Sequence, residues 1–237
     1  ASSKQPDLGV VHVQTTGRNQ NDEVVLTYER KVQVWKGSVE AKVDDAPTVQ
    51  APYVECELRL PAYDAGNRYG ELAHLTNADT YFEDFQPGDT LQHWRGRVMT
   101  SEHVALTAML DNTSQVHCNQ HMIDQNPEKY LGGQLIVFGG IPFNLCLGLS
   151  SPDTSDNALG DVRYVTGKHT APIFAGDTVF ASTEITGKED LANRPDLGLV
   201  RMNLRGHKFV RKDNNFEKVE IFYLEREVAV KRRSHYC

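Results

Sequence analysis

The sequence predicts an α+β fold in which an antiparallel sheet curls around one central helix. The longest apolar segment, residues 135–149, is apolar on nearly all sides, which is typical of a helix enclosed by other elements. Alternating apolar and polar residues follow it at 160–171 and 177–189, and again in a terminal hairpin. A helix that is apolar on all sides and is followed by antiparallel strands buries its apolar surface when the sheet wraps around it.

An internal repeat predicts how the chain is organised. The segment PDLGVVHVQTTG at 6–17 recurs as PDLGLVRMNLRG at 195–206, and VVLTYERKVQVWK at 24–36 recurs as VEIFYLEREVAVKR at 219–232. Each copy predicts a β-hairpin, with turns at 21–22 and 213–215. The second hairpin closes a complete unit, expected at 81–237. The first has nothing in front of it, so residues 1–36 are expected to be the terminal strands of a partial first unit.

The connection between the two hairpins and the packing of the first hairpin are less regular parts of this arrangement. Residues 37–80 hold Pro47, Pro52 and Pro61 and little periodicity, which predicts an irregular connection in which 54–60 could add a strand. The first hairpin, lacking its own helix, would expose apolar surface and a sheet edge. We expect it to pair with the sheet of the second unit, with a further N-terminal segment or with another copy of the chain.

The second unit opens with a turn at 87–89 and a strand after it. Thr100 or Ser101 is a suitable N-cap for a helix that reaches about Leu110. One face of this helix is expected to be buried, through Val104, Leu106, Ala108, Met109 and Leu110.

A polar, ionisable segment at 111–132 separates this helix from the long apolar one. His117 is its pivot, because a histidine between two buried elements, upstream of Gly139-Gly140, lies where a site is expected. His103, His121 and His169 are interpreted as non-catalytic. His117, Cys118, His121 and Asp124 could be taken for a zinc site, but no second ligand pair follows at suitable spacing, so we expect no metal.

Composition excludes other classes of function. The net charge of −7 argues against nucleic-acid binding, and the basic KRRSHYC tail is interpreted as a solvated end. No apolar run is long enough to span a membrane, and no signal peptide is visible in the first residues. The four cysteines lack a framework spacing, which indicates reduced thiols in a cytoplasmic protein.

The order of elements resembles the MaoC-like branch of the hot-dog fold, and more closely the double-hot-dog mesaconyl-CoA (2-methylfumaryl-CoA) hydratases. The resemblance is carried by FEDFQPGDT at 82–90, NTSQVHCN at 112–119, LIVFGG at 135–140, GKHTAPIFAGDTVFASTEI at 167–185 and PDLGLVRM at 195–202. It implies reversible hydration of an enoyl-CoA thioester, in a homo-oligomer and without a cofactor. It also implies that an acidic residue and a histidine hold the water while backbone amides receive the thioester oxygen.

The expected roles follow from this resemblance and from the chemistry. Imidazole suits a general base near neutral pH, so His117 is the expected acid/base. Its partner is Asn112 or Asp111, because the family's usual D-x-N-P-x-H motif places an aspartate where this chain has Asn112, which cannot accept a proton. The remaining expected groups are Gly139, Gly140 and Ile141 as oxyanion donors, and Arg163, Lys168 and His169 near the free carboxylate of a dicarboxylic acyl group.

Two other functions stay open at this point. Hot-dog proteins also hydrolyse acyl thioesters, so the chain could be a thioesterase. The partial first unit and Asn112 also fit a non-catalytic subunit that binds acyl thioesters.

Overall fold

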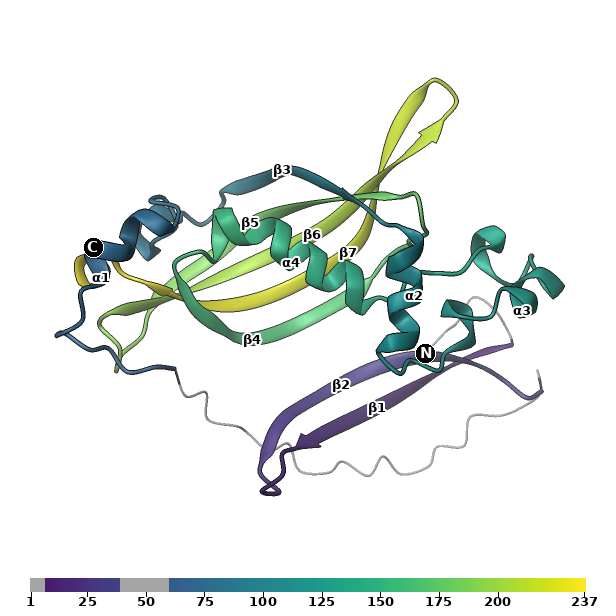
Figure 1. Cartoon of the computed structure of the whole chain (residues 1–237), viewed down its shortest axis with the longest axis horizontal. Helices are drawn as coiled ribbons and strands as arrows, with labels where there is room; N and C mark the ends of the chain where they lie inside the picture. Colours follow the sequence, from purple (N-terminus) through teal and green to yellow (C-terminus); the bar gives the residue numbers. More distant parts are fainter. Residues whose placement is uncertain (1–6, 39–59) are drawn as a thin grey trace. The chain divides into compact units, whose positions relative to one another are not determined.

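A computed structural model describes residues 7–38 and 60–237, and the chain divides into two compact units, Ala1–Arg59 and Leu60–Cys237. The described part of the first unit is an antiparallel hairpin of β1 (Leu8–Arg18) and β2 (Val24–Trp35), as predicted (Figure 1). Its turn holds Asp22 at a φ of 65°. Among the described residues the hairpin forms a two-stranded sheet, and its expected pairing partner stays a prediction.

The second unit is an antiparallel sheet of five strands in the order β3-β5-β6-β7-β4. Figure 1 shows one long helix, α4 (Gly140–Thr154), lying across its concave face, which confirms the predicted α+β class. The strands are β3 (Thr90–Val98), β4 (Ala158–His169), β5 (Thr178–Asp190), β6 (Leu197–Lys212) and β7 (Asn215–Lys231).

The limits of α4 differ from those predicted from the apolar run. Residues 135–138 are irregular rather than helical, because the Ile136 amide donates to Val116 O (3.1 Å) and the Val137 amide to Ile173 O (2.8 Å), and Gly139 is the turn residue before the helix. The helix then runs through Pro152 to Thr154. A proline so close to the end of a helix removes one hydrogen bond only, so it does not stop the helix.

The core forms where α4 meets the sheet. Alternate residues of the central strands point at the helix and are buried, as period-two burial requires. The cluster joins Cys146 of α4 with strand residues and with the segment that precedes the helix, and its members are Met99, Val137, Ile141, Ile173, Val179, Ala181, Leu204, Ile221, Phe222 and Leu224. A burial-induced rise of the pKa of Cys146 to about 12 keeps its thiol protonated.

Helix α2 (Ser101–Met109) begins as predicted and packs differently. Thr100 and His103 form a reciprocal capping box at its start. The expected buried face is wrong, because Leu106, Met109 and Leu110 are exposed. The remaining helical segments are short: α1 (Tyr69–Leu72), α3 (Gln120–Gln125), α5 (Arg233–Tyr236) and the 3-10 turns Ala73–Leu75, Phe82–Asp84, Gln115–His117 and Leu131–Gly133.

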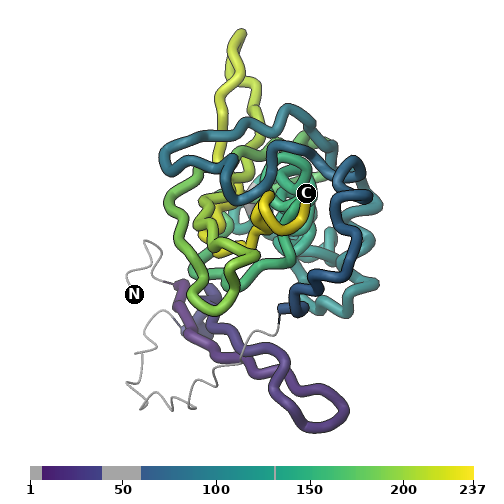
Figure 2. The backbone as a smooth tube through the Cα atoms, turned by 90° about the vertical axis from the view of Figure 1, so that its left-hand side faces the viewer, coloured from purple at the N-terminus to yellow at the C-terminus, as the bar shows by residue number. Residues whose placement is uncertain are grey.

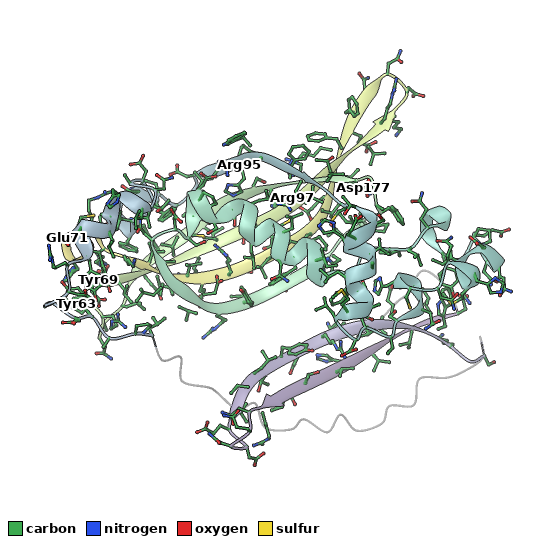
Figure 3. The ribbon with its side chains drawn as sticks, viewed as in Figure 1. Tyr63, Tyr69, Glu71, Arg95, Arg97 and Asp177 are labelled. Carbon is green, nitrogen blue, oxygen red and sulfur yellow. The ribbon has the colours of Figure 1, made fainter. Side chains whose placement is uncertain are left out.

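Both ends of the second unit pack against its folded part, and only the tail differs from expectation. Within residues 60–80, Tyr63 and Tyr69 pack with buried Tyr236 at the end of the unit far from Asp177 (Figure 3). The basic tail is not a solvated end, because the Tyr236 hydroxyl donates to Asp196 (2.8 Å) and Arg233 pairs with Asp84. The predicted strand at 54–60 lies almost wholly outside the described residues.

Candidate functional site

His117 ends the 3-10 turn Gln115–His117, in the loop between α2 and α3, and is half-buried. Its Nδ1 lies 2.7 Å from the carbonyl oxygen of Ile136, and its ring meets the ring of Phe138 edge-on at 5.8 Å. A carbonyl can only accept, so Nδ1 carries the hydrogen and Nε2 of the neutral ring keeps its lone pair. A backbone carbonyl therefore sets the tautomer that a general base requires.

A cavity of about 510 Å³ opens beside this histidine. One wall is apolar and comes from helix α2, through Val104, Ala105 and Ala108. The other lining residues are mostly polar: Ser101, His117, Cys118, Gln120 and Gln134, together with Leu135 and Ala175. Such a mixture fits a small acyl group that lies on the apolar wall while polar side chains fix its orientation.

The N-terminus of α4 supplies two free amides near His117. The Ile141 amide already donates to Phe138 O at 2.9 Å, whereas the amides of Gly139 and Gly140 form no hydrogen bond among the described residues. Neither position has room for a side chain. A Cβ on Gly139 would lie 2.5 Å from Nε2 of His169, and one on Gly140 would lie 2.7 Å from the ring of Phe138. Free amides at a helix N-terminus attract negative charge.

His169 ends strand β4 on the face that α4 covers. Besides its contact with Gly139, its ring lies 5.4 Å from the ring of Phe222. Burial lowers the pKa of His169 below its ordinary value, so the ring is neutral near pH 7. The structure thus brings His117 and His169 to the same short segment, 136–139, from two different elements.

Arg163 and Lys168 do not join this group. Directly opposite residues of antiparallel strands point to the same face, and His169 is opposite buried Phe222. Lys168 is opposite Tyr223 and Arg163 is opposite Glu227, to which it pairs at 3.8 Å. Both cations therefore lie on the face of the sheet away from α4, which separates them from His169.

Asn112 and Asp111 are also placed differently from the expected partnership. The side-chain oxygen of Asn112 accepts from the Ser114 amide at 2.9 Å, which closes the turn leading to His117. Asp111 is exposed, has a φ of 53° and lies just after the C-cap of helix α2. Neither side chain hydrogen-bonds to His117 in the described part of the chain. Asn112 thus shapes the turn that carries His117.

Sequence reasoning missed the α2 wall. Ala105 and Ala108 are three residues apart, which puts them on one face of a helix, but small residues on an exposed helix give no chemical signal. Gln134 was missed because it lies in an irregular segment before α4. Only the spacing of the alanines could have indicated a wall against which a ligand packs.

Within residues 7–38 and 60–237, no three His, Cys, Asp or Glu side chains are grouped to hold a metal ion. Cys118, Cys146 and Cys237 are free thiols. In the same described ranges, no helix is both long enough and apolar enough to cross a membrane.

Comparison with known proteins identifies relatives along nearly the whole chain. Residues 1–215 match the family model described as mesaconyl-CoA hydratase. The chain is 31% identical to beta-methylmalyl-CoA dehydratase of Chloroflexus aurantiacus, covering 98% of this chain and 67% of the relative. It is 33% identical over 200 residues to mesaconyl-CoA hydratase of Cereibacter sphaeroides, covering 83% of this chain and 55% of the relative. The chain thus spans between about half and two thirds of the length of these relatives.

Solved structures give the same fold. The crystal structure of a MaoC domain protein dehydratase from Chloroflexus aurantiacus superposes with a TM-score of 0.78 at 30% identity, covering 98% of this chain and 67% of that one. A Mycobacterium tuberculosis protein with a double hotdog fold superposes with a TM-score of 0.64 at 16% identity, covering 93% of this chain and 62% of that one. At 16% identity the second match supports a common fold only.

Proposed function

The chain belongs to the mesaconyl-CoA hydratase family, and we propose that it catalyses the reversible addition of water to a branched enoyl-CoA thioester such as mesaconyl-CoA. The reaction class is that of a carbon-oxygen lyase. The relatives are named for this reaction and for the dehydration of beta-methylmalyl-CoA, which is a reaction of the same type.

One observation carries the proposal. His117 lines a cavity, and its Nδ1 lies 2.7 Å from Ile136 O, so that Nε2 is the nitrogen left to act as a base when the ring is neutral. Two free amides, those of Gly139 and Gly140, lie at the start of the adjacent helix. Hydration of a double bond conjugated to a thioester needs these two components, a base for water and donors for the developing enolate oxygen.

The steps balance with a single histidine. Nε2 of His117 takes a proton from water as the water oxygen bonds to the β-carbon. The electrons of the double bond move to the thioester oxygen, and the amides of Gly139 and Gly140 stabilise that charge. The imidazolium of His117 then returns the proton to the α-carbon, which restores the thioester carbonyl and the neutral base. Asn112 need not exchange a proton in this scheme.

His169 is proposed as a third donor to the thioester oxygen. Its ring lies against Gly139 and its lowered pKa keeps it neutral, and a neutral imidazole can still donate an N–H. The Ile141 amide is engaged with Phe138 O, so we assign the oxyanion to Gly139, Gly140 and His169 instead.

The acyl branch is proposed to rest on Ala105 and Ala108 of the α2 wall. A methyl branch needs only a small apolar surface there. Arg163 and Lys168, on the other face of the sheet, are not assigned to the free carboxylate; the neutral side chain of Gln134, on the cavity wall, is assigned to it instead. Assembly as a homo-oligomer, action without a cofactor and a cytoplasmic location complete the proposal.

The test is an assay of the unmodified chain with mesaconyl-CoA and crotonyl-CoA. Loss of the near-ultraviolet absorbance of the conjugated thioester, without release of free thiol, is the expected result. Release of thiol would instead identify a thioesterase. Binding of the ester without either change would identify a non-catalytic binding subunit and would contradict the proposal.

A further inference from the structure

Strands β6 and β7 continue beyond the sheet as a two-stranded arm, residues 207–220 (Figure 2). Pairing with β5 ends at Lys208 and pairing with β4 ends at Phe222, so the rest of the arm is flanked by neither strand. Phe209 and Phe216 on this arm are 47% and 70% exposed. Exposed phenylalanines on a projecting hairpin are costly unless something covers them.

The arm leaves the sheet at the end that holds the proposed site. Phe222 pairs with His169, and His169 contacts Gly139 at the start of α4. The turn 172–178 joins the two regions. Lys208 of the arm bonds to Pro172 O (3.0 Å) and to Asp177 (2.7 Å), while Ala175 of the same turn lines the cavity beside His117. Figure 3 shows Asp177 at the base of the arm.

One face of the arm combines aromatic rings with cations. A hollow of about 530 Å³ at its base is lined by Phe180, Phe209 and Phe216, with Gly176, Asp177 and Thr178. Lys218 is directly opposite Phe209, and Arg211 is directly opposite Phe216, so both cations share the face of the rings. His207 supports this face from within, stacked on Phe180 at 5.8 Å and edge-on to Phe209 at 5.6 Å.

This chemistry selects a ligand with a flat ring and phosphate groups. Phenylalanine faces stack on purines whatever the base, and lysine and arginine bind phosphate. The negative charge of Asp177 is already compensated by Lys208. Because the proposed function requires a CoA thioester, and resting on that function, we infer that the aromatic face of the arm binds the adenosine-phosphate end of the CoA while the acyl group lies beside His117.

A second copy of the chain is a poorer occupant of the same face. In a two-fold dimer the same patch meets itself, so Arg211 and Lys218 would approach a second pair of cations. A nucleotide brings the opposite charge. The two occupants therefore differ in the electrostatics they meet on this face.

The experiment compares two esters of one acyl group, the CoA ester and the N-acetylcysteamine ester, which lacks the nucleotide. The variants are Phe209→Ala with Phe216→Ala, and Arg211→Ala with Lys218→Ala. Matched controls are Val210→Ala and Lys212→Ala, from the opposite face of the same arm. We expect each double variant to raise KM for the CoA ester at least about fivefold, as loss of one stacked base or phosphate contact would. The double variants should turn over the short ester at the unchanged rate. The two control variants should keep the KM of the unmodified chain for the CoA ester.

Direct binding separates this inference from the proposed function. Titration calorimetry with adenosine 3′,5′-bisphosphate should give binding to the unmodified chain and loss of it in both double variants, whether or not the chain hydrates any ester. Weaker binding of AMP, which has one phosphate, is expected if CoA is the source of the ligand. Equal KM values for the CoA ester in variants and controls would overturn the inference. So would a change of the variants from dimer to monomer in sedimentation without loss of nucleotide binding.

Discussion

Two residues without side chains give the proposed site its form. Gly139 and Gly140 leave room for the rings of His169 and Phe138, and their amides stay free at the start of α4. Oxyanion donors of this kind need such close approach, because a side chain at either position would displace the groups that surround the thioester.

Gly139→Ala should therefore lower activity while the protein still folds. The new Cβ would lie 2.5 Å from Nε2 of His169, so the ring must move away from the proposed oxyanion position. We expect kcat to fall by about 10²-fold, the usual effect of losing one oxyanion donor. The control is Gly148→Ala in the same helix, where a Cβ meets nothing within 4 Å. That change should keep kcat and raise the free energy of unfolding by about 0.5–1 kcal/mol. Equal kcat in both variants would contradict the role of His169.

Variants of Asn112 distinguish a structural role of this residue from a catalytic one. Asn112→Asp keeps an oxygen that accepts from the Ser114 amide, so kcat should change by less than tenfold if the residue only shapes the turn. Asn112→Ala loses that bond and should lower the free energy of unfolding by about 1 kcal/mol. A large increase of kcat in Asn112→Asp would show that a carboxylate is needed as a second proton carrier.

The sequence predicted part of this site. His117 and the glycines could be found because the motif and its position before an apolar helix carry a chemical meaning. The tautomer of His117 could not, because it depends on the carbonyl of Ile136, which folding brings close across 19 residues. Arg163 and Lys168 were grouped with His169 because the family resemblance places this strand and turn beside the substrate channel, and alternation along β4 separates them.

Among the elements, the turn 172–178 connects the sheet, the cavity and the arm. Asp177 accepts from the Phe174 amide at 2.9 Å and pairs with buried Lys208 at 2.7 Å. Lys208 also donates to Pro172 O, so one ammonium group holds both ends of the turn.

Lys208→Ala should destabilise the protein because it leaves Asp177 without its cation. Breaking a buried pair from one side costs about 3 kcal/mol. The matched change, Lys212→Ala, breaks the exposed pair with Glu217 and should cost less than about 1 kcal/mol. Urea unfolding of the two variants measures the difference. Equal losses would mean that the turn is held by other contacts.

The long helix shows where sequence periodicity is insufficient. An apolar run can continue outside a helix, and 135–138 is such an irregular segment because the Ile136 and Val137 amides bond to the Val116 and Ile173 carbonyls. The strands of the second unit were predicted closely, since alternation and turn residues are local signals. The packing of residues 60–80 and of the tail depends on Tyr63, Tyr69 and Tyr236, which meet only after folding.

For the whole molecule, three histidines make stability depend on pH in the same direction. Burial lowers the pKa of His93 and His169, and burial with nearby Lys218 lowers the pKa of His207 to about 4. In the unfolded chain these histidines have their ordinary pKa of about 6.5 and bind protons as the pH falls below it, whereas in the folded chain they bind protons only at lower pH. The stabilisation is therefore complete above about pH 6.5 and is lost as the pH falls toward 4.

His207→Phe should reduce this dependence. The free energy of unfolding of the unmodified protein should fall between pH 6.5 and 4, and His207 alone contributes at most about 1.4 kcal/mol per pH unit. The variant keeps an aromatic ring between Phe180 and Phe209 but cannot titrate. Denaturant titrations at several pH values measure both slopes, and the same slope in both proteins would contradict the prediction.

The internal repeat links the two units of the chain. β1 and β2 repeat the sequence of β6 and β7, but the first hairpin has no helix of its own within the described residues. Val25, Leu26 and Val34 on it are exposed. The sequence predicted both the hairpin and this exposed surface, because the repeat can be recognised by comparing the two segments of the sequence.

The central proposal, hydration with His117 as the acid/base, is tested most directly by comparing His117→Ala with His121→Ala. Both histidines follow helix α2 within the same polar segment, but only His117 lines the cavity. The measurement is the loss of conjugated-thioester absorbance on mesaconyl-CoA. We predict that His117→Ala lowers kcat by about 10²–10⁴-fold and that His121→Ala leaves it unchanged. An unchanged rate in His117→Ala would contradict the proposed mechanism.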